Sequence, residues 1–259
     1  MRLAAVTTIK IVALPAEHGA SVMLGESLLA GLLIAVSGHG FLPALGWVFL
    51  FLMSNPLKIA IKDISRHVFT ARTSVALWFC TGFGILALGF FLATFYYSGP
   101  SFLLILIGVI PLGMIHLWAV VNAGKKEFIA ELFGALTLGA AAASIILAAG
   151  HFYVQAMTVW AILAIRAGTS VVYVRHRLNQ TRGKGYNLAL LILIHTLGIA
   201  FLGGLVIAHL AKPIILIAGF LLTLRLLFVL NKSSVSPVLL GVQESILGII
   251  FVILIVVGI

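Results

Sequence analysis

Apolar runs of about 20 residues recur along the whole chain and constrain its fold more than any other feature, because a helix of that length crosses roughly 30 Å of hydrocarbon. Hydrophobic residues make up 63% of the chain and charged residues only 8%. Soluble domains carry about 25% charged residues. Membrane β-barrels alternate polar and apolar residues, and these runs do not. The sequence therefore predicts an all-α, polytopic membrane helical bundle, a single integral membrane domain over residues 1–259.

Turn residues and charges divide the apolar sequence into nine predicted spans, joined by connections that alternate strictly between short and long. The second span is short before Pro56, so we expect its helix to continue into the polar segment beyond that proline. The predicted spans cover residues 19–36, 40–54, 74–95, 101–122, 130–149, 152–174, 187–208, 213–230 and 238–259.

Basic residues gather on one side of this predicted topology, and short loops rich in Lys and Arg stay in the cytoplasm. The other side collects only Lys212. We therefore expect a cytoplasmic N-terminus, an outside C-terminus and a location in the plasma (inner) membrane. The basic side collects Arg2, Lys10, Lys58, Lys62, Arg66, Arg72, Lys125, Lys126, Arg175, Arg177, Arg182, Lys184 and Lys232.

Six predicted spans each place one ionisable side chain roughly 8–14 Å from the cytoplasmic end, at about 1.5 Å per helical residue. Intramembrane ionisable residues are costly and usually face a bundle interior or a wet cavity. One interpretation is a central polar cavity that opens to the cytoplasm; the other is pairwise neutralisation, such as Glu26 with Arg166, that holds helices together. The six residues are Glu26, His116, Arg166, His195, Arg225 and Glu244.

Two basic segments, "SNPLKIAIKDISRHVFTART" and "VVYVRHRLNQTRGKGYN", follow the second and sixth predicted spans. Both contain an Arg-His dipeptide, and the guanidinium fork of arginine suits phosphate oxygens. The segments could together hold a diphosphate or a lipid headgroup. The alternative is that they are long positive-inside loops and no more.

Several familiar chemistries have no support in the sequence. HExxH, GxSxG and close carboxylate clusters are absent, so we predict neither a metal site nor a cofactor. Cys80 is the single cysteine, which excludes an intrachain disulfide. Nucleic acid is not an expected partner, because the aromatic residues lie in the spans and not among the basic residues.

The stretch "PAEHGASVML", Pro15 to Leu24, resembles the Pro-x-Glu-His-Gly-Ala signature of the YwiC-like membrane proteins, with Ser21 where that signature usually has Trp. "NPLKIAIKD" and "VVYVRHRL" resemble two further segments of that family, and the similarity covers most of the chain. The resemblance implies a bacterial membrane protein and no particular activity.

The layout also resembles the UbiA prenyltransferase superfamily, which implies nine helices around a cytoplasmic-side cavity. In that superfamily, aspartate-rich segments after the second and sixth helices hold magnesium, and the magnesium holds a prenyl diphosphate. Asn55, Asp63 and the Arg72-Thr73 pair match the skeleton of the first segment, but Asp63 is its only acid. One aspartate cannot supply the oxygens that two Mg²⁺ ions need. Lys and Arg could instead bind the phosphate directly.

The leading hypothesis is therefore a UbiA-like membrane protein whose cavity binds a phosphate-bearing or isoprenoid-like lipid, with or without a metal-independent transfer reaction. The alternatives are a transporter or flippase, and a non-catalytic membrane subunit with a basic docking face. Glu26, Asp63 and His195 are the predicted acid–base residues. The predicted phosphate-binding set is Glu17, His18, Asn55, Lys58, Lys62, Arg66, Arg72, Arg166, Arg175, Arg177 and Lys184.

The adjacent Glu17 and His18 stand at the start of the first span and have two interpretations. Histidine titrates near neutral pH, so His18 could carry a proton or bind a headgroup at the cavity mouth. Alternatively, Pro15 sets the turn and Glu17 meets the positive N-terminus of the helix. Neighbouring residues on a helix do not face each other, so the pair does not imply a dyad.

Overall fold

The structure, a computed structural model, describes residues 12–13, 18–36, 38–122, 126–185, 187–230 and 236–259, and these residues form helices and short connections without strands. Glu17 lies outside the described residues. The helices are α2 (His18–Ala35), η1 (Gly38–Gly40), α3 (Phe41–Ser65), α4 (Ala71–Ser98), α5 (Leu103–Val121), α6 (Glu127–Ala148), α7 (Tyr153–Thr181), α8 (Leu188–Ile207), α9 (Ile215–Leu224), α10 (Leu226–Leu230) and α11 (Pro237–Gly258).

Seven of the described helices are long and apolar enough to cross a membrane, and α2 and α9 add two shorter apolar helices. Each predicted span corresponds to one of these nine, which confirms the all-α prediction of a multi-pass membrane protein. As expected, α3 continues through Pro56 to Ser65. Side-chain caps fix several helix starts; the Asn187 side chain accepts a hydrogen bond from Leu190 N, and Ser236 accepts one from Leu239 N.

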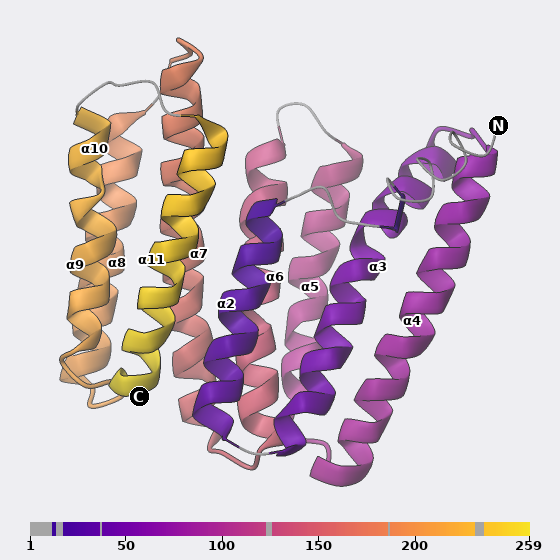
Figure 1. Ribbon diagram of the computed structural model, residues 1–259, viewed down its shortest axis with the longest axis horizontal. Coiled ribbons are helices and arrows are strands. Elements are labelled where there is room, and N and C mark those ends of the chain that lie inside the picture. The colour runs from indigo at the N-terminus through magenta and orange to yellow at the C-terminus, as the bar shows by residue number, and fades with distance from the viewer. Residues whose placement is uncertain (1–11, 14–17, 37, 123–125, 186, 231–235) are drawn as a thin grey trace.

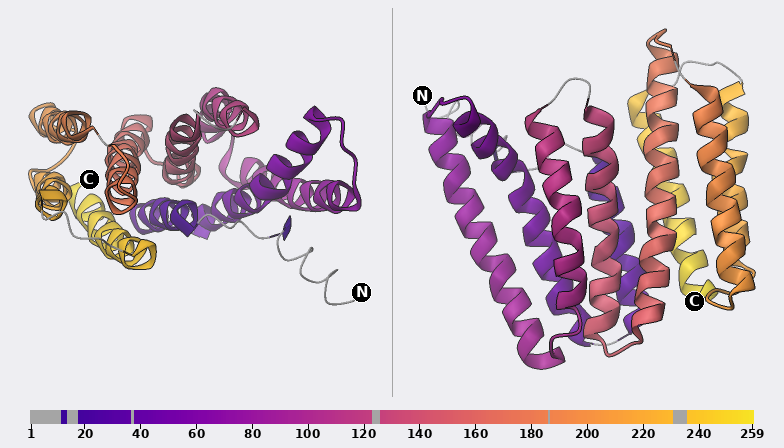
Figure 2. Two further views of the ribbon diagram at one scale, coloured as in Figure 1. Left: turned by 90° about the horizontal axis from the view of Figure 1, so that it is seen from above. Right: turned by 180° about the vertical axis from the view of Figure 1, so that it is seen from behind.

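The helices form two facing rows (Figures 1 and 2). Helices α11, α2 and α3 make one row and α7, α6 and α5 the other, with α4 at one end of the long axis and α8 and α9 at the opposite end. The ends of α3, α5, α7 and α10 and the starts of α4, α6, α8 and α11 share the upper end of the bundle in Figure 1. We call this end the basic end, because Arg66 and Arg182 cap the ends of α3 and α7 there and Lys126 caps the start of α6. Lys212, between α8 and α9, belongs to the other end.

Helix α6 lies at the centre because its small side chains let neighbours approach closely. Ala140 to Ala143 are completely buried. A Cβ atom added to Gly31 of α2 would lie 3.0 Å from Ala142 Cα and 3.0 Å from Ile145 Cβ. Small residues at helix interfaces are a common basis of packing in membranes, where the hydrophobic effect does not hold helices together.

This close approach makes Gly31 sensitive to substitution. We expect Gly31→Ala to lower the melting temperature of the detergent-solubilised protein, because overpacking costs about 1–3 kcal/mol. Gly25→Ala on the same helix is the control, since a Cβ there meets nothing within 4 Å. Equal melting temperatures for the two variants would contradict the packing of α2 on α6.

Candidate functional site

A buried ion network joins Glu26 of α2, Arg166 of α7 and Glu244 of α11. Arg166 Nη2 donates to Glu26 Oε1 at 3.1 Å and to the Glu244 backbone oxygen at 2.9 Å. Arg166 Nη1 donates to Glu244 Oε2 at 2.9 Å. All three side chains are buried. Glu26 with Arg166, the neutralising pair that the sequence suggested as an alternative, is therefore in contact.

Arg225, between α9 and α10, completes the ion network as a second arginine bound to Glu244. Its Nη1 donates to Glu244 Oε1 at 2.7 Å and to Oε2 at 3.0 Å. Ser170, one turn after Arg166 on α7, accepts hydrogen bonds from both arginines. The Arg225 guanidinium also stands 4.6 Å from the ring centroid of Tyr173, in cation–π range. Two guanidinium groups thus face two carboxylates.

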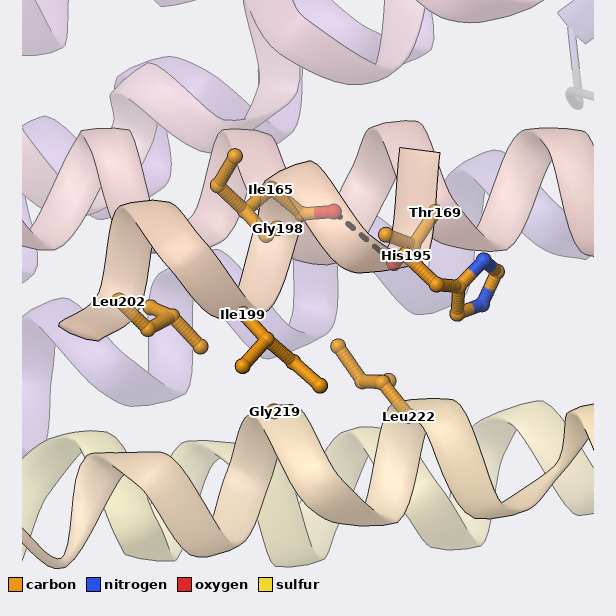
Figure 3. Close-up of a pocket in the computed structure, with 8 residues that line it drawn as sticks. All are labelled: Ile165, Thr169, His195, Gly198, Ile199, Leu202, Gly219 and Leu222. Carbon is orange, nitrogen blue, oxygen red and sulfur yellow. Dashed lines mark hydrogen bonds between the residues drawn. The ribbon is translucent and has the colours of Figure 1, made fainter. Parts of the chain in front are cut away.

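His195 of α8 stands at the edge of the ion network. Its Nδ1 is 2.8 Å from Leu191 O, so this nitrogen carries the proton and donates to the carbonyl. The Nε2 atom is then left to accept from Arg225 Nη2 at 3.3 Å. Figure 3 shows His195 at one end of a narrow crevice between α7, α8 and α9, where Thr169 donates to Ile165 O at 2.9 Å. Both ring nitrogens already have partners.

The ion network is tightly packed. A Cβ atom at Gly248 of α11 would overlap the Glu26 carboxylate, so a larger residue there would displace the Glu26 side chain. The space beside Glu26, Ser27 and Arg166 measures about 10 Å³, roughly the room for one water molecule. A headgroup cannot enter the network in this arrangement unless side chains move.

His116, the sixth residue of the predicted layer, is not part of the ion network. It lies on α5, and its Nδ1 is 2.7 Å from Ala130 O of α6. Counting residues along the predicted span gave His116 a similar depth. Its helix α5, however, lies on the far side of α6 from α8 and α9 (Figure 1).

Asp63, the predicted acid of the first basic segment, holds the α3–α4 connection together. Its carboxylate accepts from Arg72 Nη2 at 2.9 Å and from Thr73 Oγ1 at 2.9 Å. Thr70 and Thr73 form a capping box at the start of α4. Asn55 Nδ2 donates to Val12 O at 3.0 Å. The Asp63 contacts thus form a structural corner, in which each carboxylate oxygen already accepts a hydrogen bond from α4.

Arg175 and Arg177 of the second basic segment have different surroundings. Arg175 pairs with Glu127 at 3.2 Å and with Glu131 at 2.8 Å, both on α6. Arg177 is buried and donates to Gln180 Oε1 at 2.5 Å. Lys184 lies on the exposed α7–α8 connection.

The structure does not bring the two basic segments together. Helices α3 and α4 occupy one end of the long axis and the end of α7 lies toward the other (Figures 1 and 2). Lys58, Lys62, Arg66 and Arg72 therefore cannot share one small phosphate with the α7 residues in this arrangement. His18 is the first residue of α2, and its side chain is not among those described. In the described part of the chain, His, Cys, Asp and Glu side chains do not gather in threes around a metal-sized site.

Sequence reasoning missed Ser170, Tyr173 and Gln180, which contact these charged residues. The sequence spacing of these residues would have predicted that they share a helix face with Arg166 and Arg177. Positions 166, 170, 173, 177 and 180 follow one another at intervals of four and three residues, which places them on one face of a helix.

Glu244 is the residue on which the ion network depends most. We expect Glu244→Gln to destabilise the protein by about 3–5 kcal/mol, because two buried guanidinium groups would then share one carboxylate. Glu127→Gln makes the same chemical change in an exposed pair, worth about 0–1 kcal/mol. Thermal unfolding in detergent compares the two variants, and a loss as small for Glu244→Gln as for Glu127→Gln would refute the network.

Comparison with known proteins identifies the family of this chain. No match was found among curated proteins or among solved structures. The family model described as YwiC-like protein matches residues 14–146, just over half of the chain. The match includes "PAEHGASVML" and "NPLKIAIKD", whereas "VVYVRHRL" lies beyond it. The chain belongs to the YwiC-like family.

Proposed function

We propose that this multi-pass membrane protein binds the phosphate-bearing headgroup of an amphipathic, isoprenoid-like lipid at the basic end of α7. The observation that carries the proposal is a polar face along this helix, which we call the α7 stripe: Arg166, Ser170, Tyr173, Arg177 and Gln180. All but Gln180 are buried, although α7 is apolar enough to span a membrane. Polar residues in such a position are a functional-site hypothesis by default.

The α7 stripe connects the ion network to the surface by successive contacts. Arg225 bonds to Ser170 and stacks on Tyr173, one turn above. One further turn along, Arg177 donates to Gln180, and Gln180 Nε2 donates to Val229 O of α10 at 3.0 Å. Hydrogen-bond donors therefore follow one another from the interior to the basic end.

Exposed cations stand where the α7 stripe reaches the surface. Arg182 and Lys184 lie on the α7–α8 connection, around Gly183 with a φ of 64°. A guanidinium binds two phosphate oxygens at once and an ammonium supplies a compact charge. We assign these two side chains as the first contacts of the headgroup, with Arg177 behind them. The basic end would face the cytoplasm of the inner membrane, as the positive-inside rule predicts.

The proposal is restricted to binding. Glu26 and His195, predicted as acid–base residues, are engaged in the ion network, and Asp63 lies at the other end of the long axis. The proposal therefore takes from the resemblance to prenyltransferases only the class of ligand, and it includes no transfer reaction.

A transport function is the second candidate, and the ion network favours it. Its residues come from α2, α7, α8 and α11 and from the α9–α10 junction. Glu26, His195 and Glu244 lie about 10–12 Å along their helices from the basic end, at about 1.5 Å per residue. Buried charge pairs among several helices are typical of substrate and ion pathways. Movement of lipid from one leaflet to the other by the wild-type protein in vesicles would favour this candidate.

Native mass spectrometry of the protein purified in mild detergent tests the binding proposal. We expect a retained phosphorylated lipid whose bound fraction falls about tenfold or more in the Arg182→Gln/Lys184→Gln variant, since charged hydrogen bonds each contribute about 1.5–3 kcal/mol. Lys62→Gln/Arg66→Gln removes the same charge at the other end of the long axis and should leave that lipid bound. Bare wild-type protein, or equal retention by both variants, would rule the α7 site out.

A further inference from the structure

We propose that the α3–α4 connection is a separate anchor that binds the anionic lipid surface of the membrane. We call residues 62–73 the α3–α4 tip. It lies at the far end of the long axis from the α7–α8 connection (Figure 1), and the proposal does not depend on the α7 site. Three properties carry it: a rigid backbone, exposed apolar side chains and cations outside any described ion pair.

The α3–α4 tip is rigid because Asp63, near the end of α3, forms hydrogen bonds to the start of α4. The Asp63 carboxylate binds Arg72 and Thr73 on α4. Its backbone oxygen accepts from Arg66 N at 3.2 Å and from Val68 N at 3.0 Å. His67 adopts a φ of 55°, a left-handed conformation that non-glycine residues keep only where surrounding contacts enforce it. The side chains of the tip are therefore presented in a fixed direction.

The α3–α4 tip exposes large apolar side chains at a helix end. Phe69 is 67% exposed, and Ile64 and Val68 are about half exposed. Exposed apolar side chains on a membrane helix face lipid, and at the end of a span they reach the boundary between acyl chains and headgroups. Trp78 of α4, seven residues after Ala71, is 79% exposed and suits the same boundary region.

Cations stand directly beside these apolar groups. Lys62 and Arg66 form no ion pair within the described residues, since Asp63, the one carboxylate of the tip, is occupied by Arg72. Lysine and arginine can extend their apolar stems along the hydrocarbon while the charge reaches the headgroups. Apolar insertion together with positive charge matches an anionic leaflet better than an acidic protein surface, which would leave Phe69 without an apolar partner.

Fluorescence quenching in vesicles tests the proposal on the full chain. A Trp118→Phe parent removes the other strongly exposed tryptophan, so that Trp78 reports on the lipid beside α4. The parent is placed in phosphatidylcholine vesicles that contain either brominated phosphatidylglycerol or brominated phosphatidylcholine, and quenching of Trp78 fluorescence by the brominated lipid is measured. We expect stronger quenching by phosphatidylglycerol at equal mole fraction. Each cation near the surface contributes about fivefold to binding of an anionic lipid, so Lys62→Gln/Arg66→Gln should lower the preference for phosphatidylglycerol about 25-fold. Added salt should lower it as well.

Matched variants make the outcome decisive. Arg182→Gln/Lys184→Gln should keep the preference, because it removes equal charge elsewhere, and Arg66→Lys should keep it because the charge remains. Equal quenching by the two lipids in the parent would overturn the proposal. So would a preference that survives Lys62→Gln/Arg66→Gln or disappears in the Arg182→Gln/Lys184→Gln control. Loss of the lipid at the α7 site would not affect this readout.

Discussion

The rest of the structure depends on the contact of Glu244 with two arginines. Arg166 and Arg225 approach this carboxylate from α7 and from the α9–α10 junction, and Arg166 also reaches Glu26 on α2. A charge inside a bilayer is tolerated when it is paired, so each of these residues requires the others. Close apolar packing brings the helices together, and these hydrogen bonds add contacts that are made only at one rotation and one depth of each helix.

The ion network also determines what the remaining cations can do. Because carboxylates already occupy the inner face of Arg166 and Arg225, a phosphate would have to displace them to bind there. Arg72 and Arg175 are held in the same way by Asp63 and by the α6 glutamates. The proposed anion sites therefore use cations that form no ion pair within the described residues, on the α7–α8 connection and on the α3–α4 tip.

Much of the fold follows from the sequence, because span length and apolar composition are local properties. Each predicted span has its helix, and even the continuation of α3 past Pro56 could be expected from the short second run. The shared depth of Glu26, Arg166, His195, Arg225 and Glu244 also followed from counting residues along helices. What counting cannot reveal is which helices are neighbours, since every lipid-facing surface is equally apolar. His116 has the predicted depth but the wrong neighbours, and the two basic segments share an end of the bundle but not a site.

The difference between a residue's depth and its neighbours explains why the arginines of this chain have different roles. An arginine next to a buried carboxylate, such as Arg166 beside Glu26, stabilises the arrangement of helices. An arginine nearer the surface, such as Arg177 about three turns along α7, has the same charge and donates to the side chain of Gln180. An arginine beyond the helix end, such as Arg66 or Arg182, is exposed and can contact molecules outside the protein. Depth along the helix and the presence of an opposing carboxylate together decide the role of each arginine, and sequence alone supplies only the first.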